Sequence, residues 1–108
     1  MRSVAFTNMT TQPVDICNGV GYSLKRLNPG KSYTLNVSDH GIWLYFKAVA
    51  DNVVTDTYTY WNGQFTIDGK GIRSKDGTVH FKKWRYSVLN LENAGKVAQI
   101  ASLVIKKK

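Results

Sequence analysis

The sequence is poor in the features that mark secreted and membrane proteins. It has a single cysteine, Cys17, so no disulfide can form within the chain. No apolar run approaches the roughly 18 residues of a membrane span, and the start, MRSVAFTNMTTQ, lacks the apolar core of a signal peptide. We therefore expect a cytoplasmic protein in which Cys17 is a small buried or half-buried residue, although secretion of a shortened chain is left open.

Residues that carry catalytic or metal-binding chemistry are also scarce. The two histidines, His40 and His80, are far apart and show no spacing typical of zinc or nucleophile sites. The seven acidic residues form no paired pattern for acid–base catalysis. Gly69-Lys70-Gly71 is too short for a phosphate-binding loop. The sequence thus predicts no enzyme activity, no cofactor and no metal site.

The chain has instead the composition of a β-rich domain. Hydrophobic residues make up 43% and aromatic residues 12% of the 108 residues, enough to bury a core without disulfides or metals. Short alternating segments are separated by turn signals about every 8–12 residues. This pattern predicts an all-β fold, an antiparallel β-sandwich of seven to nine short strands. We expect one domain over residues 1–108, with a basic tail at residues 106–108.

The pattern is clearest in residues 27–48. Asn28-Pro29-Gly30 predicts a type II turn, because proline presets φ at the first central position and glycine accepts positive φ at the second. Residues 31–37 alternate and predict a strand with one wet face. After a polar corner at residues 38–41, residues 42–48 are apolar on both faces. Such a strand is usually central in its sheet and covered on both sides.

Three predictions concern the second half of the chain. Residues 53–61 are β-branched and aromatic and predict one strand, and Asn62-Gly63 predicts a type I′ hairpin into the next strand. The apolar positions change parity at Lys82-Lys83, which indicates a β-bulge. Residues 96–105 fit either a last strand or a short helix.

The net charge of +8 is concentrated toward the end of the chain. Residues 1–66 hold five basic and four acidic groups, whereas residues 67–108 hold ten basic and three acidic groups. This asymmetry fits an acidic partner, which would be nucleic acid, an anionic membrane surface or an acidic protein. It equally fits a solvated basic face and a charged tail that maintain solubility. In residues 82–86, KKWRY, cations alternate with aromatic residues, as they do on surfaces that stack nucleic-acid bases. The same alternation also fits a strand whose aromatic residues face the core.

Three segments carry a family resemblance: VAFTNMT at residues 4–10, LNPG at residues 27–30 and NVSDHGIWLY at residues 36–45. In order and spacing they resemble the β-domain of the von Hippel–Lindau tumour suppressor family, over about residues 3–48. The resemblance implies a β-sandwich that binds an extended, hydroxyproline-bearing peptide as the substrate receptor of a ubiquitin ligase.

The residue matches refine what this resemblance implies. Trp43 matches the family's corner tryptophan. The family's four pocket positions hold Val37, Gly41, Leu24 and Asn18 here, so its hydroxyproline pocket is not retained. The segment that follows Leu89 lacks the leucine-then-cysteine spacing with which the family docks on elongin C. The resemblance therefore implies the fold more directly than the ligand.

These observations lead to three hypotheses for function. The first is a non-enzymatic module that binds an extended peptide or protein by strand pairing and aromatic anchors, using Ser38, His40, Trp43, Tyr22 and Trp61. The second is a basic domain that binds nucleic acid or another polyanion through Lys82, Lys83, Arg85, Lys106, Lys107 and Lys108. The third is a sandwich that binds carbohydrate or a membrane surface with exposed tryptophan and tyrosine. The sequence does not predict an oligomeric state.

Overall fold

The computed structural model describes residues 2–76 and 80–85, and these residues hold ten short strands. Those residues contain no helix, and hence none that could span a membrane. The strands are β1 (Arg2–Asn8), β2 (Val14–Asn18), β3 (Ser23–Leu27), β4 (Ser32–Val37), β5 (Ile42–Ala48), β6 (Val53–Val54), β7 (Tyr58–Tyr60), β8 (Gly63–Ile67), β9 (Gly71–Ser74) and β10 (His80–Lys83). Residues 96–105, for which helix and strand were both open, lie outside this part.

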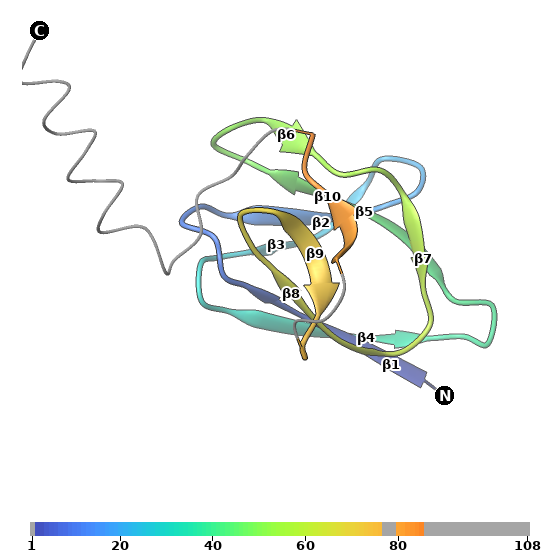
Figure 1. Cartoon of the computed structure of the whole chain (residues 1–108). Coiled ribbons are helices and arrows are strands. Elements are labelled where there is room, and N and C mark those ends of the chain that lie inside the picture. The colour runs from blue at the N-terminus through green and yellow to red at the C-terminus, as the bar shows by residue number, and fades with distance from the viewer. Residues whose placement is uncertain (1, 77–79, 86–108) are drawn as a thin grey trace, which may run out of the picture.

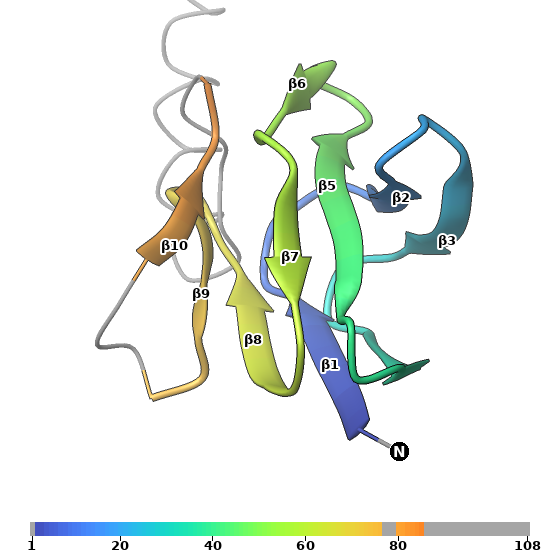
Figure 2. The same ribbon diagram turned by 90° about the vertical axis from the view of Figure 1, so that its right-hand side faces the viewer.

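The strands form two sheets that face each other (Figure 1). The first, here called the β1 sheet, has the order β10-β9-β8-β1-β4; the second, the β5 sheet, has the order β3-β2-β5-β6, with β7 also paired to β5. Figure 2 shows β10, β9 and β8 on one side of the molecule and β5, β2 and β3 on the other. The predicted all-β sandwich is confirmed. It differs in detail, because residues 2–76 and 80–85 already hold ten strands and β1 pairs with β8 in parallel.

The predicted hairpin at Asn62-Gly63 is wrong, and the parallel pair explains why. β7 before this turn pairs with β5, whereas β8 after it pairs with β1 and β9. A type I′ turn needs positive φ at both central positions. Gly63 has φ of 106°, but Asn52 is the one described non-glycine residue with positive φ. The turn therefore carries the chain from one sheet to the other, where β8 enters parallel to β1.

The single strand predicted for residues 53–61 is divided into β6 and β7. Thr55 lies between them and interrupts the ladder with β5. Its hydroxyl accepts a hydrogen bond from the Phe46 N–H at 3.1 Å, and its own N–H donates to the Phe46 carbonyl at 3.0 Å. Thr55 also forms an isolated bridge with Trp84. A side chain thus occupies a donor of β5 that a continuous strand would have paired.

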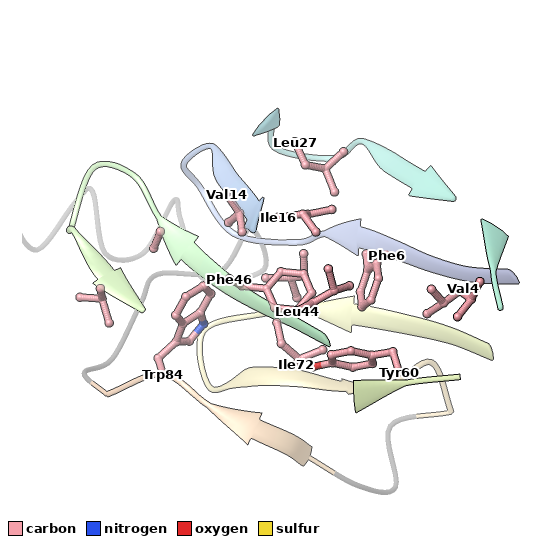
Figure 3. Packing of buried hydrophobic residues seen from close by; sticks show 14 residues of the cluster. Val4, Phe6, Val14, Ile16, Leu27, Leu44, Phe46, Tyr60, Ile72 and Trp84 are labelled. Carbon is pink, nitrogen blue, oxygen red and sulfur yellow. The ribbon is translucent and has the colours of Figure 1, made fainter. Parts of the chain in front are cut away.

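The core fills the space between the two sheets (Figure 3). Phe6 of β1 is fully buried against Phe46 of β5, with ring centroids 4.9 Å apart, and the Tyr60 ring meets Phe6 edge-on at 5.2 Å. Each such ring pair adds about 0.5–1.5 kcal/mol beyond area burial. The buried cluster comprises Val4, Phe6, Val14, Ile16, Leu27, Val37, Leu44, Phe46, Ala48, Val53, Tyr60, Ile67, Ile72 and Trp84.

β5 is central in its sheet, as predicted, because it pairs with β2 on one side and with β6 and β7 on the other. Leu44 and Phe46 point inward and are fully buried. On the opposite face Trp43 is 61% exposed and Tyr45 is half-buried. The prediction that β5 is covered on both sides is therefore wrong within the described residues. An exposed tryptophan on a sheet face is a feature that core packing does not explain.

The turn at Asn28-Pro29-Gly30 has the predicted geometry. Gly30 has φ of 79°, and the Lys31 N–H donates to the Asn28 carbonyl at 3.1 Å. Beyond it, β4 alternates as expected, with Val37 buried and Ser32, Thr34 and Asn36 exposed.

The fully buried Asn8 fixes this turn to the start of β2. Its amide nitrogen donates to the carbonyls of Gln12 and Leu27, both at 2.8 Å. The side-chain oxygen accepts hydrogen bonds from Thr10. The Asn8 side chain, at the end of β1, thereby holds the loop at residues 9–13. It also ties the end of β3 to this loop.

Candidate binding site

The corner between β4 and β5 is a tight turn pressed against the end of β7. The Ser38 carbonyl accepts the Gly41 N–H at 3.0 Å, and the Ser38 hydroxyl accepts the His40 N–H at 3.3 Å. Gly41 has φ of 78°, and a Cβ placed on it would lie 2.7 Å from the Thr59 methyl and 3.0 Å from Trp61 Nε1. Glycine is therefore required here both for the backbone conformation and for the close approach of the two strands.

Two tryptophans project from the outer face of the β5 sheet beside this corner. Trp43 lies directly opposite Thr59 in the antiparallel pair of β5 and β7, so the two side chains share a face. Trp61 follows β7 two residues after Thr59 and lies against Gly41. Trp43 is 61% exposed and Trp61 is 44% exposed. The sequence placed both among the partner-binding candidates, and the structure brings them to one side of the sheet.

The turn between β2 and β3 adds two more exposed apolar side chains. The Asn18 side-chain oxygen accepts the N–H groups of Val20 at 3.1 Å and Tyr22 at 3.0 Å, which folds the turn around it. Val20 is 78% exposed and Tyr22 is 71% exposed. A Cβ on Gly19 would lie 3.3 Å from the Trp43 Cβ, so this turn packs directly beside the tryptophan.

Between these elements lies an open groove of about 670 Å³, here called the tryptophan groove. Its walls come from the β2–β3 turn, the start of β5 and the segment before β7, and its lining residues are Asn18, Gly19, Val20, Gly41, Ile42, Trp43 and Thr57. None of these side chains is ionisable. The groove can therefore offer apolar contact, an indole surface and backbone hydrogen bonds, but no charge or proton-transfer group.

The five predicted contact residues take different places around the groove. Trp43 lines it, whereas Ser38 and His40 are exposed in the turn that leads to it. Tyr22 and Trp61 belong to the turns on either side. Sequence reasoning missed Val20, Ile42 and Thr57. The exposed valine in a glycine-rich turn was a readable signal, but Thr57 reaches the groove only through the pairing of β7 with β5.

Cys17 is a buried residue of the β5 sheet, as predicted. It is 4% exposed and lies opposite Tyr45 in the pair of β2 and β5. Burial raises the pKa of the Cys17 thiol, and burial likewise raises the pKa of the Tyr45 phenol. Among the described residues no cluster of three or more histidine, cysteine, aspartate and glutamate side chains could hold a metal ion.

The basic segment has a different arrangement from the one that base stacking needs. Trp84 is 6% exposed, and its Nε1–H donates to the Asp68 carbonyl at 2.6 Å. Lys82 lies over the Tyr58 ring, with Nζ 5.1 Å from the centroid, and Arg85 contacts Asp56 at 3.3 Å. Because Trp84 lies in the core, its indole is not available to stack on a nucleic-acid base.

Two further predictions concern the β-bulge at Lys82-Lys83 and the lysines at the end of the chain. The predicted β-bulge is present, although the register shift lies between His80 and Lys82, just before the pair of lysines. Lys106, Lys107 and Lys108 lie outside the described residues.

No known protein family, curated protein or solved structure matches this chain. The resemblance to the von Hippel–Lindau β-domain therefore stays a prediction that rests on the three sequence segments.

Proposed function

We propose that the chain is a non-enzymatic binding module that recognises an extended peptide or protein segment at the tryptophan groove. The observation that carries this proposal is the 61% exposure of Trp43 at the mouth of an uncharged groove. Exposed tryptophan that fills no core is typical of binding surfaces, where a few aromatic side chains supply most of the affinity. Val20 lines the same groove, and Trp61 lies against Gly41, another lining residue.

The free edge of β4 supports an extended form for the ligand. β4 has six residues with no charge and no proline, and it pairs with β1 in an unbroken register. No described strand pairs with its other edge. Such an edge has main-chain donors and acceptors ready for an added strand.

The other edge strands carry features that discourage pairing. β3 contains Lys25 and Arg26, and β10 contains Lys82 and Lys83 next to its register shift. β6 and β7 have only two and three residues. Charge, bulges and short length are the usual means by which edges are protected. β4 is thus the edge best suited to accept a partner strand, and it leads directly into the corner that ends at Gly41 in the groove.

The family resemblance suggests a role in substrate recognition for ubiquitin ligation. Of the four positions that correspond to the family's pocket, Val37 is 2% exposed and Gly41 has no side chain. We therefore expect a ligand other than hydroxyproline. A pull-down with elongin B and elongin C tests the ligase role separately. Retention of the chain would support that role, whereas no retention would remove it and leave peptide binding to be tested by itself.

Selection of a random peptide library against the whole chain tests the binding function. We expect enrichment of extended peptides with apolar or aromatic residues, and loss of their binding in Trp43→Ala. Raising the salt from 50 to 200 mM should change the affinity by no more than about threefold, whereas a polyanion ligand that makes several phosphate contacts would lose orders of magnitude. Equal enrichment against the wild type and Trp43→Ala would contradict the proposal.

Exposed tryptophan also favours one alternative, the stacking of indole rings on neutral sugars. Binding of the chain to an oligosaccharide array tests this alternative against the peptide proposal. Binding there that depends on both Trp43 and Trp61, without any selected peptide, would replace the peptide proposal with a carbohydrate-binding one.

A further inference from the structure

The outer face of the β1 sheet has a second hollow, on the opposite side of the sandwich from the tryptophan groove. It has a volume of about 530 Å³ and is lined by residues of β1, β4, β8 and β9. The sheet register explains the hollow, because Ala5 lies between Thr34 of β4 and Gln64 of β8. Its methyl group is the smallest side chain in that row, so it forms a low floor between taller neighbours.

A row of hydroxyl groups crosses the sheet beside this floor. Ser32, Thr7 and Thr66 are direct neighbours on β4, β1 and β8, and Arg73 of β9 continues the row. The Thr7 and Ser32 hydroxyls are hydrogen-bonded to each other at 2.7 Å, which leaves each with further hydrogen-bonding capacity. We call this surface, with Gln64 and Lys75, the hydroxyl face.

The cations at one end of the hydroxyl face are held in place by the fold. Asp68 is buried, and its Oδ1 accepts the N–H groups of Lys70 at 2.9 Å and Gly71 at 3.1 Å. Its Oδ2 lies 2.7 Å from Arg73 Nε. The turn thus orients the carboxylate, and the carboxylate orients the guanidinium.

Lys75 adds a second cation to the same lining. With two cations and one carboxylate, the described lining residues carry one net positive charge. A bound cation is therefore disfavoured, and an anionic group is favoured at this end.

The lining also narrows the class of anion. Among the described lining residues Phe65 is the one aromatic, and its ring packs on Phe6 and Tyr60 in the core. These lining residues therefore offer no indole or phenol that could stack on a nucleobase. The hydroxyl and amide groups instead match a ligand rich in hydroxyls. The volume is in the range of small-molecule sites.

We propose that the hydroxyl face is a binding site for a small anionic sugar, with its phosphate or carboxylate group at Arg73 and Lys75 and its hydroxyls on Thr7, Ser32, Thr66 and Gln64. The proposal is independent of the peptide site, since the two hollows lie on opposite outer faces of the sandwich.

Calorimetric titration of the whole chain with glucose 6-phosphate, glucuronic acid, glucose and inorganic phosphate tests this site. We expect at least one of the two anionic sugars to bind, and glucose and phosphate each to bind about tenfold or more weakly, because each lacks half of the contacts. Comparison of glucose 6-phosphate with glucuronic acid shows whether the site prefers a phosphate ester or a carboxylate. Binding of phosphate as tight as that of the sugar phosphate, or no binding of either anionic sugar, would overturn the proposal.

Three variants and one control locate the binding. Lys75→Gln should weaken it about tenfold by removing a charge-assisted contact, and Ala5→Leu should abolish it by filling the floor. Lys47→Gln, on the outer face of the other sheet, is the matched control and should leave it unchanged. Since Ala5→Leu also adds bulk to β1, Thr66→Val gives a nearly isosteric second test within the hydroxyl row. Unchanged affinity in both Lys75→Gln and Thr66→Val would overturn the assignment, as would equal loss in the Lys47→Gln control.

Discussion

Trp43 of β5 lies directly opposite Thr59 of β7, and its indole projects from the outer face of the sheet with 61% of its surface exposed. The antiparallel register, which the inward-facing Leu44 and Phe46 also fix, determines this direction. Trp43 is consequently held by the fold without contributing much to the core. Binding at the tryptophan groove should therefore be separable from stability, which makes the proposed function open to simple tests.

The corner gives the first test, a comparison of two glycines with nearly the same positive φ. Gly41 and Gly30 have φ of 78° and 79°, but a Cβ on Gly30 would meet nothing within 4 Å. Gly30→Ala should cost about 1 kcal/mol for the left-handed conformation alone. Gly41→Ala should cost about 2–4 kcal/mol, because overpacking against Thr59 and Trp61 is added. Urea denaturation measures both, and equal losses would contradict the close packing of the corner.

Trp84 gives a second test, through the hydrogen bond from its Nε1–H to the Asp68 carbonyl. Trp84→Phe keeps most of the buried ring and removes the donor, so we expect a loss of about 1–3 kcal/mol in the free energy of unfolding. Trp61→Phe is the matched control on an exposed residue and should change stability by no more than about 0.5 kcal/mol. Unchanged stability in Trp84→Phe would contradict a stabilising contribution from this buried hydrogen bond.

Tyr60 gives a third test, because its buried hydroxyl has no hydrogen-bond partner among the described residues. Tyr60→Phe removes that hydroxyl and leaves the ring packing against Phe6 and Phe46. We expect thermal denaturation to show the variant as stable as the wild type or more stable, by up to about 1–2 kcal/mol. A clear loss of stability would reveal that the hydroxyl is bonded in the folded protein.

The same residue predicts a dependence on alkaline pH. Burial raises the pKa of Tyr60 far above the usual phenol value, so the folded state keeps the neutral form longer than the unfolded chain does. This contribution is fully present well below pH of about 10, the pKa of the unfolded phenol, and is lost as the pH rises through that value toward the folded pKa. Between pH 8 and pH 10.5 the wild type should lose more stability in urea than Tyr60→Phe. Parallel losses would contradict the burial of an ionisable phenol.

Much of the fold could be predicted from the sequence because its strongest signals are local. Alternation in residues 31–37 placed Val37 inside and Asn36 outside, and the Pro29-Gly30 turn needs only its own backbone geometry. The errors arose where a distant partner decides the outcome. Asn62-Gly63 resembles a hairpin turn locally, but β8 pairs with β1, which lies almost sixty residues earlier.

The candidate site was predicted in part for the same reason. Trp43 was identified from its place after the corner, whereas Val20 and Thr57 join it only when β2, β5 and β7 pair. Composition could not tell an exposed tryptophan from a buried one. Trp84 and Trp43 both lie in aromatic segments, yet one donates to Asp68 in the core and the other faces outward. Trp84 follows the bulge before Lys82 and forms an isolated bridge with Thr55, whereas Trp43 lies within β5 opposite Thr59.

The most direct test of peptide recognition at the tryptophan groove is the affinity of a library-selected peptide for three proteins, measured by calorimetry. Trp43→Ala should weaken binding by about 30-fold or more, as the loss of a central aromatic anchor does, with the free energy of unfolding changed by no more than about 1 kcal/mol. Lys47→Ala, on the same face of β5 but outside the groove, should bind like the wild type. Equal affinity for Trp43→Ala and the wild type would contradict the groove as the binding site.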